Sequence, residues 1–186
     1  MSFDDHAAIF LRACELITGK YRSEFVAAIM IGQGKNIWQA EIDAPAETVD
    51  FFRCYIQEAW SLHSQQPNIQ PEGSWNKLEY RPLEGFMYAI APFNFTALGA
   101  TSVGPAVGNV VIGEPSDYVL HASWLLHQIL LEAGLPKDVI QFLPGDATNA
   151  ILKRPEFGAL SFIGSTQVFK GIQRKIGNNI GDGIYN

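Results

Sequence analysis

The sequence predicts an α/β fold in which a parallel sheet follows a layer of helices. Two short apolar runs, FMYAIAP and NVVIGEP, have the length and the β-branched or aromatic content of strands, and each ends at a proline. A long helical pattern from Asp117 ends at Gly134 before Pro136 and leads to another strand-like run at 139–143. Strand, helix and strand in this order form a right-handed parallel unit. We therefore expect a partial Rossmann-like parallel sheet with an N-terminal helical layer.

The helical layer is predicted from three patterns in the first 64 residues. Residues 2–18 carry an amphipathic stripe that is opened by the capping pair Ser2 and Asp5 and closed by Gly19. A second helix is expected from about Ser23 through Met30, with a stop near residues 32–34, and a third from about 36 to 64 with a kink or break near Pro45. The third helix is expected to pack along a side formed by Trp38, Ile42, Val49, Phe52 and Ile56.

The sheet portion is predicted to begin after a loop. Residues 65–75, QQPNIQPEGSW, are rich in proline and polar residues and separate a helical segment, 1–66, from a sheet segment, 76–186. Strand patterns occur at 77–82, 86–91, 109–113, 139–143 and 159–163. A helix of small residues is expected at 96–107, and the last helix is expected to run from Gly164 to about Ile176.

Composition and charge exclude several classes of function. The formal net charge is −6, and the 13 lysines and arginines are spread along the chain, so no basic stripe is available for nucleic acid. The longest apolar runs are far below the roughly 18 residues that span a bilayer, and the acidic N-terminus has no signal-peptide layout. Cys14 and Cys54 lie in helical patterns, so we expect buried free thiols in a reducing compartment. The four histidines have no ligand spacing, and we expect no metal site.

Asn94 is the first candidate for chemistry. It follows the first core strand, at the edge where parallel α/β sheets bind ligands. Its amide can donate a hydrogen bond to a developing oxyanion. The alternative is a structural role, because Asn94, with Thr96 after it, is also a preferred residue type for capping the helix that follows.

A second candidate is the turn before the last helix. Neither G-x-G-x-x-G nor the phosphate-binding P-loop pattern occurs in the sequence. Gly164 and Ser165 nevertheless lie at a strand-to-helix turn, where backbone N–H groups and the positive end of the helix dipole can face a pyrophosphate. The alternative is an ordinary turn.

Several motifs, in order, resemble a known family. APFNFT, GNVVIGEPSD, HQILLEAGLPKDVIQFLPGD and SFIGSTQVF resemble the N-terminal, cofactor-binding part of the aldehyde dehydrogenase superfamily. GQGKNIWQAEID and DFFR resemble its 1-pyrroline-5-carboxylate dehydrogenase branch, and the fungal members most closely. The resemblance implies NAD-dependent oxidation of L-glutamate γ-semialdehyde to glutamate in proline breakdown. It also implies the mitochondrial matrix, whereas the absence of a targeting segment in the printed chain would otherwise indicate the cytoplasm.

The resemblance also implies roles for single residues. Asn94 would stabilise the oxyanion, and Glu41 would lie near the aldehyde. Gly145 would let an adenine approach the backbone, with Val168 as its apolar neighbour, although ordinary turn and core packing are the alternatives for both. The full set of implied cofactor-binding residues is Pro92, Glu114, Ser116, Gly145, Gly164, Ser165 and Val168.

The sequence departs from the family at three places. It stops before the family's Glu-Thr/Leu-Gly-Gly-Lys segment and catalytic domain, and neither Cys14 nor Cys54 matches the nucleophile, so we expect no aldehyde oxidation by this chain alone. Glu114 stands where the family has lysine. It can accept from both hydroxyls of an adenosine ribose and repel a 2′-phosphate, or it can point to solvent. The segment between Asn94 and Asn109 looks two residues shorter than in relatives.

Two functional hypotheses follow. The chain is a fragment of such an NAD-dependent dehydrogenase, or it is a non-catalytic module that keeps NAD or pairs with a full-length relative. Apolar surface that a catalytic domain would cover is expected to favour self-association.

Overall fold

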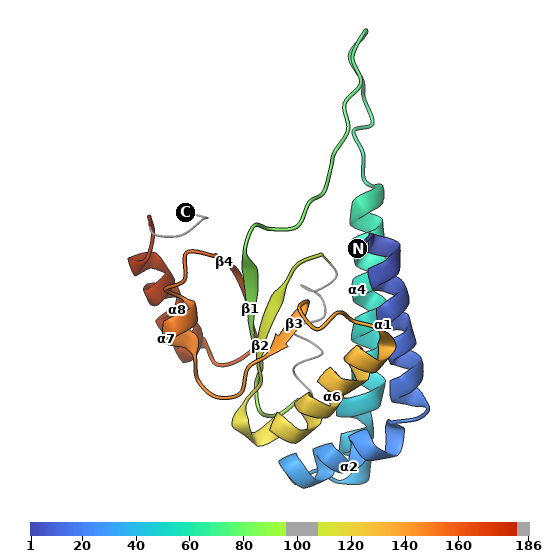
Figure 1. Ribbon diagram of the computed structural model, residues 1–186, viewed down its shortest axis with the longest axis vertical. Coiled ribbons are helices and arrows are strands. Elements are labelled where there is room, and N and C mark those ends of the chain that lie inside the picture. Colours follow the sequence, from blue (N-terminus) through green and yellow to red (C-terminus); the bar gives the residue numbers. More distant parts are fainter. Residues whose placement is uncertain (96–107, 182–186) are drawn as a thin grey trace.

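The computed structural model describes residues 1–95 and 108–181, and within them four parallel strands form the centre of the molecule (Figure 1). The strands are β1 (Phe86–Ile90), β2 (Val111–Glu114), β3 (Ile140–Phe142) and β4 (Phe157–Phe162). Their order in the sheet is β3-β2-β1-β4. The predicted α/β fold with a parallel sheet is confirmed.

Helices cover both faces of this sheet (Figure 1). One face carries the N-terminal helices α1 (Phe3–Thr18), α2 (Arg22–Gln33) and α4 (Glu47–Ser64) together with α6 (Leu120–Ala133), which follows the 3-10 helix η3 (Asp117–Val119). The short helices α3 (Ile37–Glu41) and η1 (Ile42–Ala46) connect α2 to α4. The other face carries α7 (Thr148–Ile151) and α8 (Thr166–Asn178).

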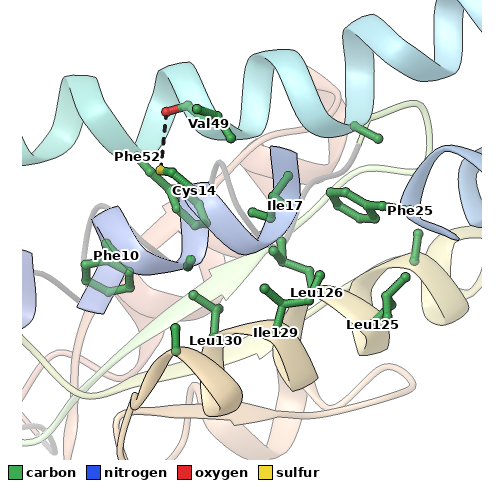
Figure 2. Packing of buried hydrophobic residues seen from close by; sticks show 14 of the residues in the cluster. Phe10, Cys14, Ile17, Phe25, Val49, Phe52, Leu125, Leu126, Ile129 and Leu130 are labelled. Carbon is green, nitrogen blue, oxygen red and sulfur yellow. Dashed lines mark hydrogen bonds between the residues drawn. The ribbon is translucent and has the colours of Figure 1, made fainter. Parts of the chain in front are cut away.

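Two apolar cores result from the alternation of side chains along the strands. Ala89, Val111 and Ile140 are fully buried against the helical layer. In the larger core, α1 packs against α4 and α6, with Phe10, Ile17, Phe52, Leu126 and Ile129 at its centre (Figure 2). Tyr88, one residue before Ala89, points to the opposite core with Ile151, Leu152 and Ile172.

The helix ends in the N-terminal layer follow the predicted capping chemistry. The Asp5 N–H donates to Ser2 Oγ at 3.2 Å, and the Ser2 N–H donates to Asp5 Oδ2 at 3.1 Å, which completes the capping box. Helix α2 ends at Gly34, whose φ of 65° lies in the left-handed region that glycine adopts without strain. The predicted capping pair is confirmed, and α2 ends in the predicted region near residues 32–34.

The predicted irregularity near Pro45 is a five-residue π-helix, η1. A proline has no N–H to donate, and the wider π turn accommodates its ring without ending the helix. The expected packing side is only partly correct: Val49 and Phe52 are buried, but Trp38 and Ile42 are 79% and 53% exposed. The extra residue in a π turn rotates the residues before it about the helix axis. The apolar stripe that was predicted from α-helical spacing therefore does not continue across Pro45.

Residues 65–85 form an arm without helix or strand that extends from the end of α4 (Figure 1). The predicted strand at 77–82 is therefore wrong. Glutamine side chains join the two limbs of the arm in place of a backbone ladder. Gln66 Oε1 accepts from the Leu78 N–H at 3.0 Å, and Gln66 Nε2 donates to the Leu78 carbonyl at 3.3 Å. Gln70 makes the same pair of bonds to the backbone of Asn76.

Candidate functional site

A cleft of about 360 Å³ lies at the carboxyl ends of β1 and β2, beside α8. The chain passes from β1 to β2 to β3 in one direction across the sheet and then returns to place β4 on the other side of β1. Ligands bind in such open α/β sheets outside the carboxyl ends of the strands, where the strand order reverses. The cleft is lined by Ile90, Glu114, Asp146, Thr148, Val168, Gly171, Ile172 and Lys175.

Glu114, the last residue of β2, is buried at the floor of this site with 9% of its surface exposed. Its Oε2 accepts from the Tyr88 hydroxyl at 2.5 Å and from the Ala147 N–H at 2.9 Å. The Tyr88 hydroxyl also lies 3.2 Å from Thr148 Oγ1. The alternative that Glu114 points to solvent is therefore wrong.

The protonation of Tyr88 fits its role as a donor. Burial, and then the hydrogen bond to Glu114, raise the pKa of the Tyr88 hydroxyl well above its usual value. The hydroxyl therefore keeps its proton at neutral pH and presents it to the carboxylate. A neutral donor facing an anion makes a charge-assisted hydrogen bond, which is among the stronger kinds.

The turn after β4 has the geometry of a helix N-terminus. Ser165 is the N-cap of α8, and its Oγ accepts from the Val168 N–H at 3.3 Å. A Cβ at Gly164 would lie 2.5 Å from the ring of Phe162, so a side chain there requires that ring to move. Val168 lines the cleft and is half exposed. The structure thus has a strand-to-helix turn at Gly164 and Ser165, as predicted.

Gly145 and Ser116 lie in the connections that follow β3 and β2. Gly145 has a φ of 85° in the turn between β3 and α7, with open space where a side chain would project. Ser116 is half buried at the start of η3, and its carbonyl accepts from the Val119 N–H at 3.0 Å. Neither residue lines the cleft, although each is close in sequence to one that does.

Asn94 lies at the same edge of the sheet, just beyond β1. Its side chain is exposed, and half-buried Pro92 precedes it. The Asn94 carbonyl accepts from Lys35 Nζ at 2.5 Å, and Lys35 also forms an ion pair with Asp43 of η1. The helix that Asn94 was expected to cap, 96–107, lies outside the described residues, as does most of the apparently shortened segment.

Glu41 is paired with a cation of the helical layer. The Arg22 guanidinium donates to its Oε1 at 2.5 Å. Glu41 is the last residue of α3, and the π-helix that contains Asp43 begins directly after it. The ion pair of Lys35 and Asp43 thus connects the neighbourhood of Glu41 to the backbone of Asn94.

Sequence reasoning missed Tyr88 and Lys35. A signal for Tyr88 was present, because a tyrosine in a buried strand needs a partner for its hydroxyl, and Glu114 ends the neighbouring strand in a paired register. For Lys35 no local signal exists, because its partners Asp43 and Asn94 come together only through the tertiary fold.

The two cysteines differ in exposure. Cys14 is buried in the larger core, with its Sγ 3.9 Å from the Val49 carbonyl (Figure 2). Burial raises the pKa of its thiol from 9.0 to about 11, which disfavours the reactive thiolate. Cys54 is exposed on α4, so the predicted burial is wrong for this residue.

Other site types find no support among the residues that the structure describes. Within 1–95 and 108–181, no three His, Cys, Asp or Glu side chains are grouped so that they could hold a metal ion. None of the helices in these ranges combines the length and the apolar character needed to cross a bilayer.

Comparisons with known proteins agree on one family. A model of the aldehyde dehydrogenase family matches residues 1–183. The mitochondrial delta-1-pyrroline-5-carboxylate dehydrogenase of Emericella nidulans is 53% identical over 188 residues, which cover 98% of this chain and 33% of that protein. The probable delta-1-pyrroline-5-carboxylate dehydrogenase of Schizosaccharomyces pombe is 50% identical over 190 residues, covering 100% of this chain and 35% of that protein.

The fold is shared with a solved relative. The delta-pyrroline-5-carboxylate dehydrogenase of Mycobacterium tuberculosis, crystallised with NAD, superposes with a TM-score of 0.95 at 43% identity. The match covers 99% of this chain and 35% of that one. The chain therefore spans about a third of the length of the relatives it matches.

Proposed function

Because the chain belongs to the aldehyde dehydrogenase family, we propose that it is the NAD-binding part of an enzyme that oxidises L-glutamate γ-semialdehyde to L-glutamate in proline catabolism. The main support for this proposal is the cleft at the carboxyl ends of β1 and β2, near the point where the strand order of the sheet reverses. The buried Glu114 carboxylate lines this cleft. Its volume of about 360 Å³ suits one nucleoside portion of a dinucleotide. The relatives' names supply the substrate, and the mycobacterial structure supplies the cofactor.

The residues present fit an adenosine and its phosphates. Glu114 accepts hydrogen bonds from the ribose, and Val168 offers an apolar wall to the adenine. Gly145, with its positive φ, leaves the backbone open to the base. Gly164 and Ser165 form the turn before α8. The N–H groups of the first turn and the positive end of the helix dipole favour an anion there, such as a pyrophosphate. Pro92 and Ser116 are assigned to the cofactor site by the resemblance alone, since neither is among the residues that line the cleft.

The chemistry that NAD supplies when bound is acceptance of the hydride from the aldehyde carbon. We assign to Asn94 the hydrogen bond that stabilises the oxyanion, since its amide is exposed at this edge and its backbone is anchored by Lys35. Glu41 is assigned a place near the aldehyde, as the resemblance implies. The support from the structure is the connection from η1 through Lys35 to Asn94.

Binding of NAD by this chain is the direct test. Titration calorimetry with NAD is expected to give saturable heat that 5′-AMP competes away, since 5′-AMP carries the adenosine portion alone. Val168→Asp places a charge against the adenine and is expected to weaken binding at least tenfold, whereas Val110→Asp, at an exposed valine away from the cleft, is expected to leave it unchanged. No binding of NAD or 5′-AMP by folded protein would contradict the proposal.

Catalysis by the chain alone is not expected. Cys14 is buried with a raised pKa, and Cys54 is on α4, away from the cleft, so neither can attack an aldehyde beside a bound cofactor. Incubation with glutamate semialdehyde and NAD is expected to yield no NADH. Formation of NADH that Asn94→Ala abolishes would overturn this expectation.

Exposed apolar side chains favour a second role, association with another chain. Ile69 and Trp75 on the arm and Val168 and Phe169 on α8 are all exposed. We propose self-association or pairing with a full-length relative; we place it in the mitochondrial matrix, and the support is that several relatives are named as mitochondrial. Sedimentation at rising concentration tests it: a strictly monomeric chain that neither binds a hydrophobic dye nor captures a full-length relative would contradict the association.

A further inference from the structure

We propose that Tyr88 is a positioning residue that fixes the orientation of the Glu114 carboxylate, and that this orientation makes the site prefer an unmodified adenosine ribose over a 2′-phosphorylated one. The inference rests on the proposed NAD site and deepens it, because it names the residue pair that would separate NAD from NADP.

The first support is the distribution of hydrogen bonds on the carboxylate. Both donors, the Tyr88 hydroxyl and the Ala147 N–H, bind the same oxygen, Oε2. Among the described residues, no hydrogen bond to Glu114 Oε1 is present, and Glu114 lines the cleft. Oε1 is therefore the oxygen that remains for a ligand. A carboxylate held at one oxygen presents the other in a fixed direction.

The second support is the rigidity of the tyrosine. Tyr88 is fully buried in the middle of β1, between Ile112 of β2 and Leu160 of β4. Its ring packs in the core beneath α7 and α8, and its hydroxyl has a further partner in Thr148. Its burial and its second partner restrict the hydroxyl, so it holds the carboxylate against rotation.

The third support is the charge of the cleft. Its charged lining residues are Glu114, Asp146 and Lys175, two carboxylates against one ammonium group. The hydroxyls of a ribose can donate to Oε1, which only accepts. A 2′-phosphate removes a donor, brings more negative charge, and meets a carboxylate that Tyr88 prevents from turning away. The arrangement therefore favours the free 2′-hydroxyl.

The test compares 5′-AMP with adenosine 2′,5′-bisphosphate, which differ only in the 2′-phosphate. Wild type is expected to bind 5′-AMP at least tenfold more tightly. Tyr88→Phe removes only the hydroxyl and is expected to reduce this ratio about threefold to tenfold, which corresponds to the net contribution of a typical hydrogen bond. Glu114→Gln removes the charge and is expected to reduce the ratio further. Tyr118→Phe, the same change at a tyrosine that is 73% exposed, is the matched control and should leave the ratio unchanged.

The outcomes separate this inference from the proposed function. If neither ligand binds wild type, the proposed NAD site is refuted. If both bind and Tyr88→Phe keeps the wild-type ratio of affinities, the proposed NAD site is supported and the positioning role of Tyr88 is refuted. An equal loss of both ligands in Tyr88→Phe would show that the hydroxyl only supports the fold, which also overturns the inference.

A measurement on wild type covers the case in which Tyr88→Phe does not fold. Tyrosine labelled with ¹³C at Cζ reports the hydrogen bond of each hydroxyl. Binding of 5′-AMP places a further donor on the Glu114 carboxylate, at Oε1, and is expected to shift the Tyr88 resonance while leaving that of Tyr80, on the arm, in place. A Tyr88 resonance that does not respond to saturating 5′-AMP would refute the coupling.

Discussion

Removal of the Phe52 ring from between α1 and α4 is expected to lower the free energy of unfolding by about 3–5 kcal/mol, the range for a phenylalanine-to-alanine change in a core. Phe52 and its partner Phe10 are both fully buried, and their rings meet edge to face with centroids 5.8 Å apart (Figure 2). For a chain of this size, about 2–4 °C is lost per kcal/mol, so the melting temperature should fall by about 6–20 °C.

The aromatic pair itself is measured by a double-mutant cycle. Phe10→Leu, Phe52→Leu and the double variant keep most of the apolar volume, so each remains folded in denaturant titrations. The coupling energy is expected to be about 0.5–1.5 kcal/mol, the contribution of an edge-to-face pair beyond its buried area. Trp60→Ala, at an exposed tryptophan on the same helix, is the control and should change stability by less than about 0.5 kcal/mol. A loss below about 1 kcal/mol in Phe52→Ala, or strict additivity of the leucine variants, would refute this account of the core.

Three further predictions concern the backbone, a buried base and the thiols. Gly85→Ala is expected to cost at least about 2 kcal/mol in a urea titration, because φ is 82° and the new Cβ would lie 2.0 Å from the Glu156 carbonyl oxygen; a neutral effect would contradict that geometry. Burial lowers the pKa of His127 below 6.5, so the unfolded chain takes up its proton first, and the stability from neutral His127 is present above pH 6.5 and lost as the pH falls. Chemical denaturation of wild type and His127→Phe between pH 8 and 5 should show a smaller acid loss in the variant, and equal losses would exclude His127 as the cause. Alkylation followed by mass spectrometry should modify exposed Cys54 well before buried Cys14, and equal rates in the native state would contradict their placement.

The sequence was sufficient where local chemistry decides the structure. The capping box of Ser2 and Asp5 and the end of α2 at Gly34 depend on neighbours within one turn; the first is as predicted, and the second lies in the region predicted for a helix stop, near residues 32–34. The strands before Pro92 and Pro115 were also predicted correctly. A short apolar run that is covered on both faces is typical of a strand inside a parallel sheet.

The failures came where distant parts of the chain decide the outcome. The pattern KLEYRP alternates like a strand, but the Gln66 side chain from the opposite limb of the arm bonds to its backbone at Leu78. Trp38 and Ile42 continue an apolar stripe in the sequence, but the π turn at Pro45 turns them to the surface. At the cleft, the sequence predicts the place of Glu114 at the end of a strand but leaves open whether its side chain enters the site or points to solvent. Its hydrogen bond to Tyr88 depends on the register between β1 and β2, which no local pattern encodes.

The packing of α1 against α6 has a consequence for how the chain acquires its structure. The two helices lie at opposite ends of the first two thirds of the sequence, and β4 reaches its place beside β1 only after α6, β2 and β3 have been made. At about 5–20 residues per second, a ribosome needs on the order of ten seconds to deliver α6 after α1. During this interval the apolar stripe of α1 has only α2 and α4 to cover it. Contacts between such distant segments slow folding, so the helical layer is completed only once α6 has been delivered.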